Sequence, residues 1–246
     1  FAIMALIVIG GIGFMTWDDI KTNGLKWKRY RMQSKVILTT TALLILIPAA
    51  YFFFFEFSDA PLNERIWSSF FQSVTPRTAG FNTVDLTTIS ETGCMIMIAL
   101  MLIGGSPGST AGGMKTTTFA VMLSNAVSVF RRREHTHFFG RRISSDTLRN
   151  AATIFTMYVT LCLVGGCAIS YMENLPLVTC LYETASAVGT VGLTLGITPE
   201  LGLPSQYILI FLMYVGRVGG LTLIFAALTG GRDVSMRLPQ EKLTVG

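Results

Sequence analysis

The sequence predicts an all-α integral membrane protein, and three observations support this fold class. Hydrophobic residues make up 51% of the 246 residues and charged residues only 13%, whereas a soluble domain usually carries about 25% charged residues. Several apolar stretches approach or exceed the ~20 residues that a helix needs to cross a bilayer. Most Lys and Arg residues lie in short segments between these stretches, where the positive-inside rule places them.

The charges also predict an orientation in a cell membrane. Six Lys and Arg residues lie in 21–35, six in 131–149 and three in 232–242, and all three clusters are expected in the cytoplasm together with the C-terminus. Nucleic acid is not expected as a partner, because little folded chain surrounds these clusters. The opposite side is marked by acidic residues, which are Glu56, Asp59, Glu64, Asp85, Glu91, Glu173 and Glu200.

Two segments are apolar but too short to span the membrane. Residues 62–77 and the stretch that opens with Pro176 are predicted as helices that cross about half of the ~30 Å hydrocarbon core at 1.5 Å per residue. Each follows a long predicted helix, over 36–57 and 148–171, and each ends at a polar, glycine-containing turn. The chain therefore divides into the end of a helix (1–14), a basic cytoplasmic loop (15–35), a first unit (36–130), a second basic loop (131–147), a second unit (148–229) and a cytoplasmic tail (230–246).

The two units form an internal repeat. A shift of 112 residues places Thr78 on Thr190, Gly80 on Gly192 and Gly104 on Gly216. Both copies start on the same side, so they are predicted to be parallel repeats around an axis along the membrane normal, which is a pore geometry.

The turns "TAGF" and "TVGL" are candidate cation ligands. A turn at membrane depth survives only inside protein or beside a wet cavity, and its glycine lets consecutive carbonyls point the same way. Rings of such carbonyls replace the hydration shell of K⁺, and the negative end of each short helix favours a cation there. A tight turn between packed helices is the alternative interpretation. The candidate residues are Thr78, Ala79, Gly80, Phe81, Thr190, Val191, Gly192 and Leu193.

Long motifs extend this pattern to a family. The stretches "TPRTAGFNT", "GGSPGSTAGGMKTTTFAV", "SAVGTVGLTLGITPELG" and "YVGRVGGLTL" resemble the Trk/Ktr/HKT superfamily of K⁺ transporters, and the membrane subunits of Ktr systems most of all. The resemblance implies four M1–P–M2 repeats around a central pore. This chain would hold the end of the second repeat and all of the third and fourth.

The resemblance also implies that the third M2 helix is broken by an intramembrane gating loop. Glycines and Pro107 prevent a continuous helix there, and few apolar contacts are expected to hold the loop in place. The gate residues are Gly104, Gly105, Ser106, Pro107, Gly108, Ser109, Thr110, Ala111, Gly112, Gly113, Lys115 and Arg217.

Arg217 stands out because a charge inside an apolar helix is costly. We expect it to raise a barrier to cations or to bond the carbonyls of the loop, and a structural ion pair is the alternative. Lys115 is expected to snorkel or to bond loop carbonyls. Glu183 is a candidate partner for Arg77 or for another donor that supports the turns.

The resemblance further implies the setting of the protein. It predicts passive K⁺ uptake through backbone carbonyls, a homodimer with one pore per monomer, and a cytoplasmic KtrA-type ring that carries the regulatory nucleotide. Na⁺ stimulates transport in some members. A TrkH-type subunit is the alternative within the family.

Other motifs favour competing interpretations only weakly. Ser106 lies in a G-x-S-x-G pattern, but a membrane hydrolase needs a base, and the only histidines, His135 and His137, lie in a basic loop. Met114 interrupts the G-K-[ST] ending of a phosphate-binding loop. A metal site at the two histidines is disfavoured against a solvated loop. The cysteines, Cys94, Cys162, Cys167 and Cys180, are interpreted as small buried thiols.

Overall fold

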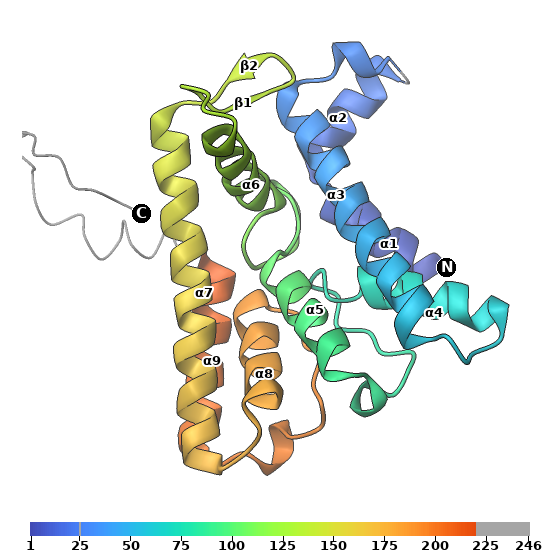
Figure 1. Ribbon diagram of the computed structural model, residues 1–246, viewed down its shortest axis with the longest axis vertical. Helices are drawn as coiled ribbons and strands as arrows, with labels where there is room; N and C mark the ends of the chain where they lie inside the picture. The colour runs from blue at the N-terminus through green and yellow to red at the C-terminus, as the bar shows by residue number, and fades with distance from the viewer. Residues whose placement is uncertain (25, 220–246) are drawn as a thin grey trace, which may run out of the picture.

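The computed structural model describes residues 1–24 and 26–219, and these residues are mostly helical (Figure 1), as the sequence predicts. A two-stranded antiparallel hairpin pairs His137 of β1 (His137–Phe138) with Arg142 of β2 (Arg141–Arg142). The helices are α1 (Ala2–Gly11), α2 (Phe14–Asn23), α3 (Met32–Tyr51), α4 (Leu62–Val74), α5 (Glu91–Leu102), α6 (Thr116–Phe130), α7 (Ser145–Glu173), α8 (Leu177–Gly189) and α9 (Leu203–Val218).

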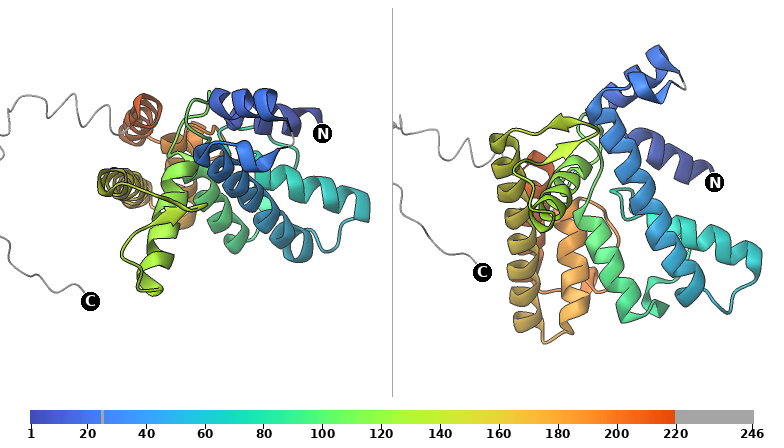
Figure 2. Two further views of the ribbon diagram at one scale, coloured as in Figure 1. Left: turned by 90° about the horizontal axis from the view of Figure 1, so that it is seen from above. Right: turned by 45° about the horizontal axis from the view of Figure 1, so that its top comes forward.

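The same order of elements occurs twice, with the 112-residue spacing of the sequence repeat. The short 3₁₀ turns Leu86–Thr88 and Thr198–Glu200 coincide under this shift, and α5 begins at Glu91 where α9 begins at Leu203. In Figures 1 and 2, α7, α8 and α9 lie on one side, α3 and α4 on the other, and α5 and α6 between them. The main core forms where α8 packs against α5, α7 and α9, around Met97, Met101, Tyr182 and Val188.

The helix lengths fit a membrane protein that contains partial spans. Met32–Glu56, which is α3 extended by a π-helical turn, and Ser145–Glu173 are long and apolar enough to cross a bilayer. The bent pair of α1 and α2 would add a third span if it counts as one. In contrast, α4 and α8 have 13 residues each, or about 20 Å of helix.

The first basic loop is partly helical, which corrects one prediction. Residues 14–23, assigned to the loop 15–35 and the preceding helix end, form α2 at 96° to α1. The bend occurs at Gly13, whose φ of 83° is open to glycine, and the indole N–H of Trp17 braces it by donating to the Ile9 carbonyl. The hairpin at 137–142 likewise lies in a segment predicted as loop.

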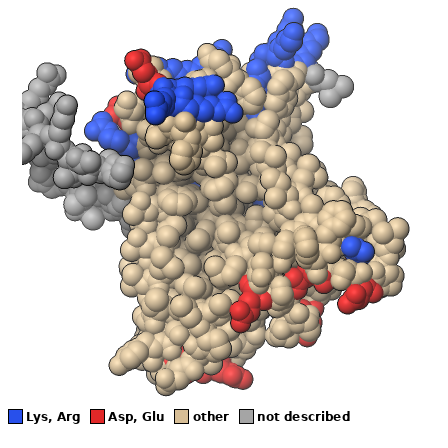
Figure 3. Space-filling model, viewed as in Figure 1, with Lys and Arg blue, Asp and Glu red and all other residues tan. Residues whose placement is uncertain are grey.

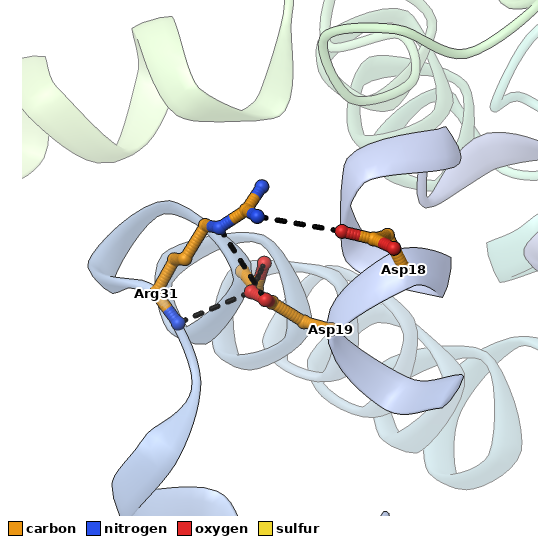
Figure 4. Close-up of polar contacts among 4 residues, drawn as sticks. Asp18, Asp19 and Arg31 are labelled. Carbon is orange, nitrogen blue, oxygen red and sulfur yellow. Dashed lines mark hydrogen bonds and ion pairs between the residues drawn. The ribbon is translucent and has the colours of Figure 1, made fainter. Parts of the chain in front are cut away.

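A carboxylate joins α2 to the start of α3 (Figure 4). Asp19 is only 3% exposed and accepts hydrogen bonds from the Ser34 hydroxyl and, at 3.1 Å, from the backbone N–H of Arg31. The Arg31 guanidinium lies 3.4 Å from Asp18 and 3.5 Å from Asp19. These contacts hold α2 against the start of α3 in a segment that is rich in charged residues.

Basic side chains gather mainly at one end of the molecule and acidic ones at the other (Figure 3). At the basic end, the hairpin joins the two described basic segments, because the Phe139 ring packs edge-on against Trp27 at 6.4 Å and Lys35 lies over the same ring. The third basic cluster, the tail and the last part of the final predicted helix lie outside the described residues. Cys167 is exposed, unlike the other three cysteines, so its predicted burial is wrong.

Candidate functional site

The two glycine turns have the same unusual backbone. Thr78 and Thr190 have φ of 62° and 55°, and Gly80 and Gly192 have φ of 70° and 90°. Left-handed backbone is uncommon for a residue other than glycine. Its appearance at equivalent positions of both units therefore indicates that the two turns share one backbone shape. We call 78–81 the first turn and 190–193 the second turn.

The turns lie side by side but are not equally crowded. A Cβ atom added at Gly80 would overlap the carbonyl oxygen of Val191. A Cβ atom added at Gly192 would meet nothing within 4 Å among the described residues. The glycine of the first turn is therefore required by space and by backbone angle, and that of the second by backbone angle alone.

The first turn is held through its own helix end. The Thr75 hydroxyl donates to the Phe81 carbonyl at 2.6 Å, across the turn. Arg77, 5% exposed, donates to Thr41 of α3 at 3.3 Å. Gln72 is fully buried on the same helix, and within the described chain its amide has no hydrogen-bond partner. Sequence reasoning missed Gln72, because nothing in the local pattern shows which face of so short a helix is buried.

The second turn is held by a buried carboxylate. Glu183 of α8 is 4% exposed and accepts from the hydroxyls of Thr194 and Thr198 and from the backbone N–H of Leu195. Ser186 accepts from the N–H of Gly192 at 3.1 Å. The predicted pair of Glu183 with Arg77 is wrong, because each group supports a different turn. The alternative prediction, that Glu183 binds other supporting donors, fits these contacts.

Residues 103–115 leave the helical path between α5 and α6. The ends of this loop are joined by main-chain hydrogen bonds, from Gly104 N–H to the Met114 carbonyl at 2.8 Å and from Thr116 N–H to the Gly105 carbonyl at 3.0 Å. The buried hydroxyl of Ser106 lies 2.9 Å from that of Thr116. Main-chain bonds across the ends of the loop thus satisfy backbone groups that a continuous helix would have paired.

The loop lies directly against both turns. A Cβ atom at Gly112 would overlap the Thr190 hydroxyl, and one at Gly104 would come within 3.3 Å of the Thr78 methyl group. A Cβ atom added at the equivalent glycine of the second unit, Gly216, would likewise come within 3.2 Å of the Thr190 methyl group.

Hydrogen bonds hold the loop to α1, to α2 and to α9, and one further bond lies within the loop. On one side, the Ser106 N–H donates to Gly11 and Phe14 N–H donates to Gly108, at the bend between α1 and α2. On the other, the Arg217 guanidinium donates to the Thr110 carbonyl at 3.0 Å. Lys115 donates to the Ala111 carbonyl at 2.7 Å, within the loop.

Arg217 lies in the last turn of the described part of α9, and none of the ion pairs found within 1–24 and 26–219 includes it. Its side chain and the second turn line one groove of about 610 Å³, which also includes Glu183, Thr198 and Met213. The groove therefore connects the candidate ligands of the second turn to the residue that contacts the loop.

The competing sites find no support in this geometry. His137 lies in the hairpin, with its Nε2 3.1 Å from Arg133, whereas Ser106 is buried beside Thr116. Across the described residues, no group of three or more His, Cys, Asp and Glu side chains could hold a metal ion.

Comparison with known proteins decides the family. The TrkH family of cation transport proteins matches residues 1–236. The chain belongs to this family. Its members are transport proteins, so the Ser106 hydrolase interpretation falls away and the protein is not an enzyme.

Similar proteins extend along nearly the whole chain. The potassium/sodium uptake protein NtpJ of Enterococcus hirae is 37% identical over 99% of this chain and 56% of its own length. The Ktr system potassium uptake protein B of Bacillus subtilis is 36% identical over 90% of this chain and 51% of its own length. The chain thus spans about half the length of the curated relatives that it matches.

The fold has a solved counterpart. The potassium transporter TrkH from Vibrio parahaemolyticus superimposes with a TM-score of 0.74 at 19% identity, over 92% of this chain and 51% of that one. The likeness concerns the arrangement of helices and carries no residue role.

Proposed function

We propose that this chain is half of a K⁺-conducting pore subunit, with the carbonyls of 78–81 and 190–193 as ligands for the ion. The observation that carries this proposal is the matching left-handed backbone of the two turns. Each turn follows a short helix, and the negative ends of α4 and α8 favour a cation between them. Two further M1–P–M2 repeats, outside this chain, would complete the ring of carbonyls.

Residues 104–113, the central part of the loop 103–115, are proposed as the gate. The loop lies against both turns, and main-chain and side-chain hydrogen bonds at its rim tie it to α9 and to the bend between α1 and α2. Its apex, 107–111, is partly or fully exposed, unlike the buried ends of the loop, so a movement of the apex disturbs little packed core and two positions of similar energy are feasible. In the closed position, Arg217 tethers Thr110 and adds a positive charge to the cation path.

The wider setting is also part of this proposal. The names of the relatives, a potassium/sodium uptake protein and two Ktr system potassium uptake proteins, support K⁺ as the transported ion and a Ktr type rather than a TrkH type. We further propose that Na⁺ stimulates transport, as the family resemblance implies. The subunit is a homodimer in the cell membrane, with its C-terminus in the cytoplasm. The basic end of the molecule receives a cytoplasmic regulatory ring, which alone binds nucleotide.

Flux through the full-length protein tests the proposal. Reconstituted in vesicles, it should pass K⁺ faster than Na⁺, and Gly80→Ser and Gly192→Ser should each lower that preference. An unchanged preference in both variants would contradict the assignment of the two turns as ligands.

A further inference from the structure

We propose that Glu183 is a positioning residue that fixes the exit of the second turn and thereby sets the preference for K⁺ over Na⁺. This inference rests on the proposed function, because it assigns a role to a residue that supports the proposed ion ligands. Glu183 does not itself line up with the carbonyls; it acts on the chain that follows them.

The contacts of Glu183 all fall on one short segment. One carboxylate oxygen accepts from the Thr194 hydroxyl and, at 3.1 Å, from the Leu195 N–H, and the other accepts from the Thr198 hydroxyl at 2.8 Å. Hydrogen bonds to an ionised carboxylate are stronger than those between neutral groups. A buried carboxylate with three donors is therefore a firm anchor for 194–198.

The segment is also braced internally. The Thr198 hydroxyl lies 2.9 Å from that of Thr194, and the Gly196 N–H donates to the Thr194 hydroxyl at 2.9 Å. Residues 194–198 thus form one polar network centred on Glu183, and the members of such a network act together.

This anchor begins at the residue that follows the proposed ligands. Leu193 ends the second turn and Thr194 starts the anchored segment. At the other side, Ser186 binds the Gly192 N–H, and α8 holds the entry. Discrimination between ions by carbonyls depends on the number and freedom of those carbonyls, so loosening one end of the turn should alter selectivity.

Within 1–24 and 26–219, the first turn has no such anchor. The 112-residue shift places Phe71, a buried apolar residue, at the position of Glu183. Of the two turns in this chain, only the second thus has a buried carboxylate at this position, and its effect should appear as altered selectivity from one part of the ring.

Glu173 provides a matched control. It also accepts from one backbone N–H and one hydroxyl, those of Gly202 and Ser205, but these groups start α9 and do not follow a turn. Glu183→Gln and Glu173→Gln therefore remove the same kind of oxygen from similar networks in different places.

The experiment measures K⁺ and Na⁺ flux per folded protein for the full-length protein in vesicles. Glu183→Gln should lower the K⁺/Na⁺ flux ratio by roughly threefold or more, whereas Glu173→Gln should lower the yield of folded protein and leave the ratio unchanged. Thr198→Val, which removes one of the three donors, should give a smaller change in the same direction.

The outcomes separate this inference from the proposed function. If Gly192→Ser changes the ratio and Glu183→Gln does not, Glu183 is only a scaffold and the inference is overturned while the filter assignment stands. If neither changes it, the inference is overturned, and if Gly80→Ser leaves the ratio unchanged as well, the filter assignment itself fails. Should Glu183→Gln not fold, Thr194→Val and Thr198→Val carry the test, and an unchanged ratio in both overturns the inference.

Discussion

The first and second turns share their backbone angles but differ in what holds them. The first is crowded by its neighbour, spanned by the Thr75 hydroxyl and backed by the buried guanidinium of Arg77. The second is open at Gly192 and anchored from behind by Glu183. One backbone shape is thus reached with opposite buried charges, which shows that the shape of the turn is the repeated requirement and its support is not.

Deleting Ser106 to Gly112 should have the largest effect on transport. The two ends of the loop are already joined by main-chain bonds, and the Cβ position of Gly113 lies 3.6 Å from the Gly104 Cα, so the shortened chain can close. K⁺ flux should rise roughly tenfold or more, because the removed barrier lies against both turns. A deletion that folds but conducts no faster than wild type would show that the loop is not the barrier.

The two glycines should respond unequally to the same substitution. Gly80→Ser combines a left-handed backbone, which costs about 1–2 kcal/mol, with overlap against the Val191 carbonyl. Gly192→Ser carries only the backbone cost. We expect a lower Tm and a larger loss of K⁺/Na⁺ preference for Gly80→Ser, measured by thermal unfolding and vesicle flux. An equal or larger effect at Gly192 would contradict the claim that the first turn is more crowded than the second.

Arg217 offers a moderate and graded effect. Arg217→Gln keeps some hydrogen bonding to Thr110 but removes the charge, so flux should rise about twofold, and Arg217→Ala should raise it further because the donors are lost as well. Lys115→Gln is the matched control, since Lys115 bonds within the loop and leaves its tether to α9 intact. If both Arg217 variants lose folded protein without any gain in flux per folded dimer, Arg217 is part of the scaffold and not of the gate.

The smallest effects should come from the single hydroxyls that hold each turn. Thr75→Val removes a donor to the Phe81 carbonyl, and Ser186→Ala removes an acceptor from the Gly192 N–H. Each should lower the free energy of unfolding by about 1 kcal/mol and change the K⁺/Na⁺ ratio less than the glycine variants do. A selectivity change as large as that of Gly80→Ser would place the control of the turn in its side chains instead of its backbone.

The sequence predicted well what depends on local pattern. The lengths of the apolar runs correctly gave the short helices α4 and α8, and the repeat aligned their turns. The polar interruption of an apolar run also corresponds to residues that form no helix between α5 and α6. In each case one stretch of chain contains the whole physical cause.

What the sequence could not predict depends on distant partners. The polar composition of α2 alone resembles a loop, and the contacts of Asp19 with Arg31 and Ser34, which fix α2 against the start of α3, come from another part of the chain. Glu183 and Arg77 flank the turns with opposite charges, so pairing them was reasonable, yet their actual partners come from 194–198 and from α3. Only the packing of helices decides which donor reaches a buried charge.

The bend between α1 and α2 has a mechanical consequence. The backbone of the loop bonds to Gly11 on one arm of the bend and to Phe14 on the other, so a rotation of α2 pulls on the loop through main-chain atoms, which do not yield as side chains do. The α2 helix is about 15 Å long, and a small rotation at Gly13 becomes a displacement of a few ångströms at its far end. Asp19 couples α2 to the start of α3. A force applied to α2 at the basic end of the molecule would therefore be transmitted to the loop.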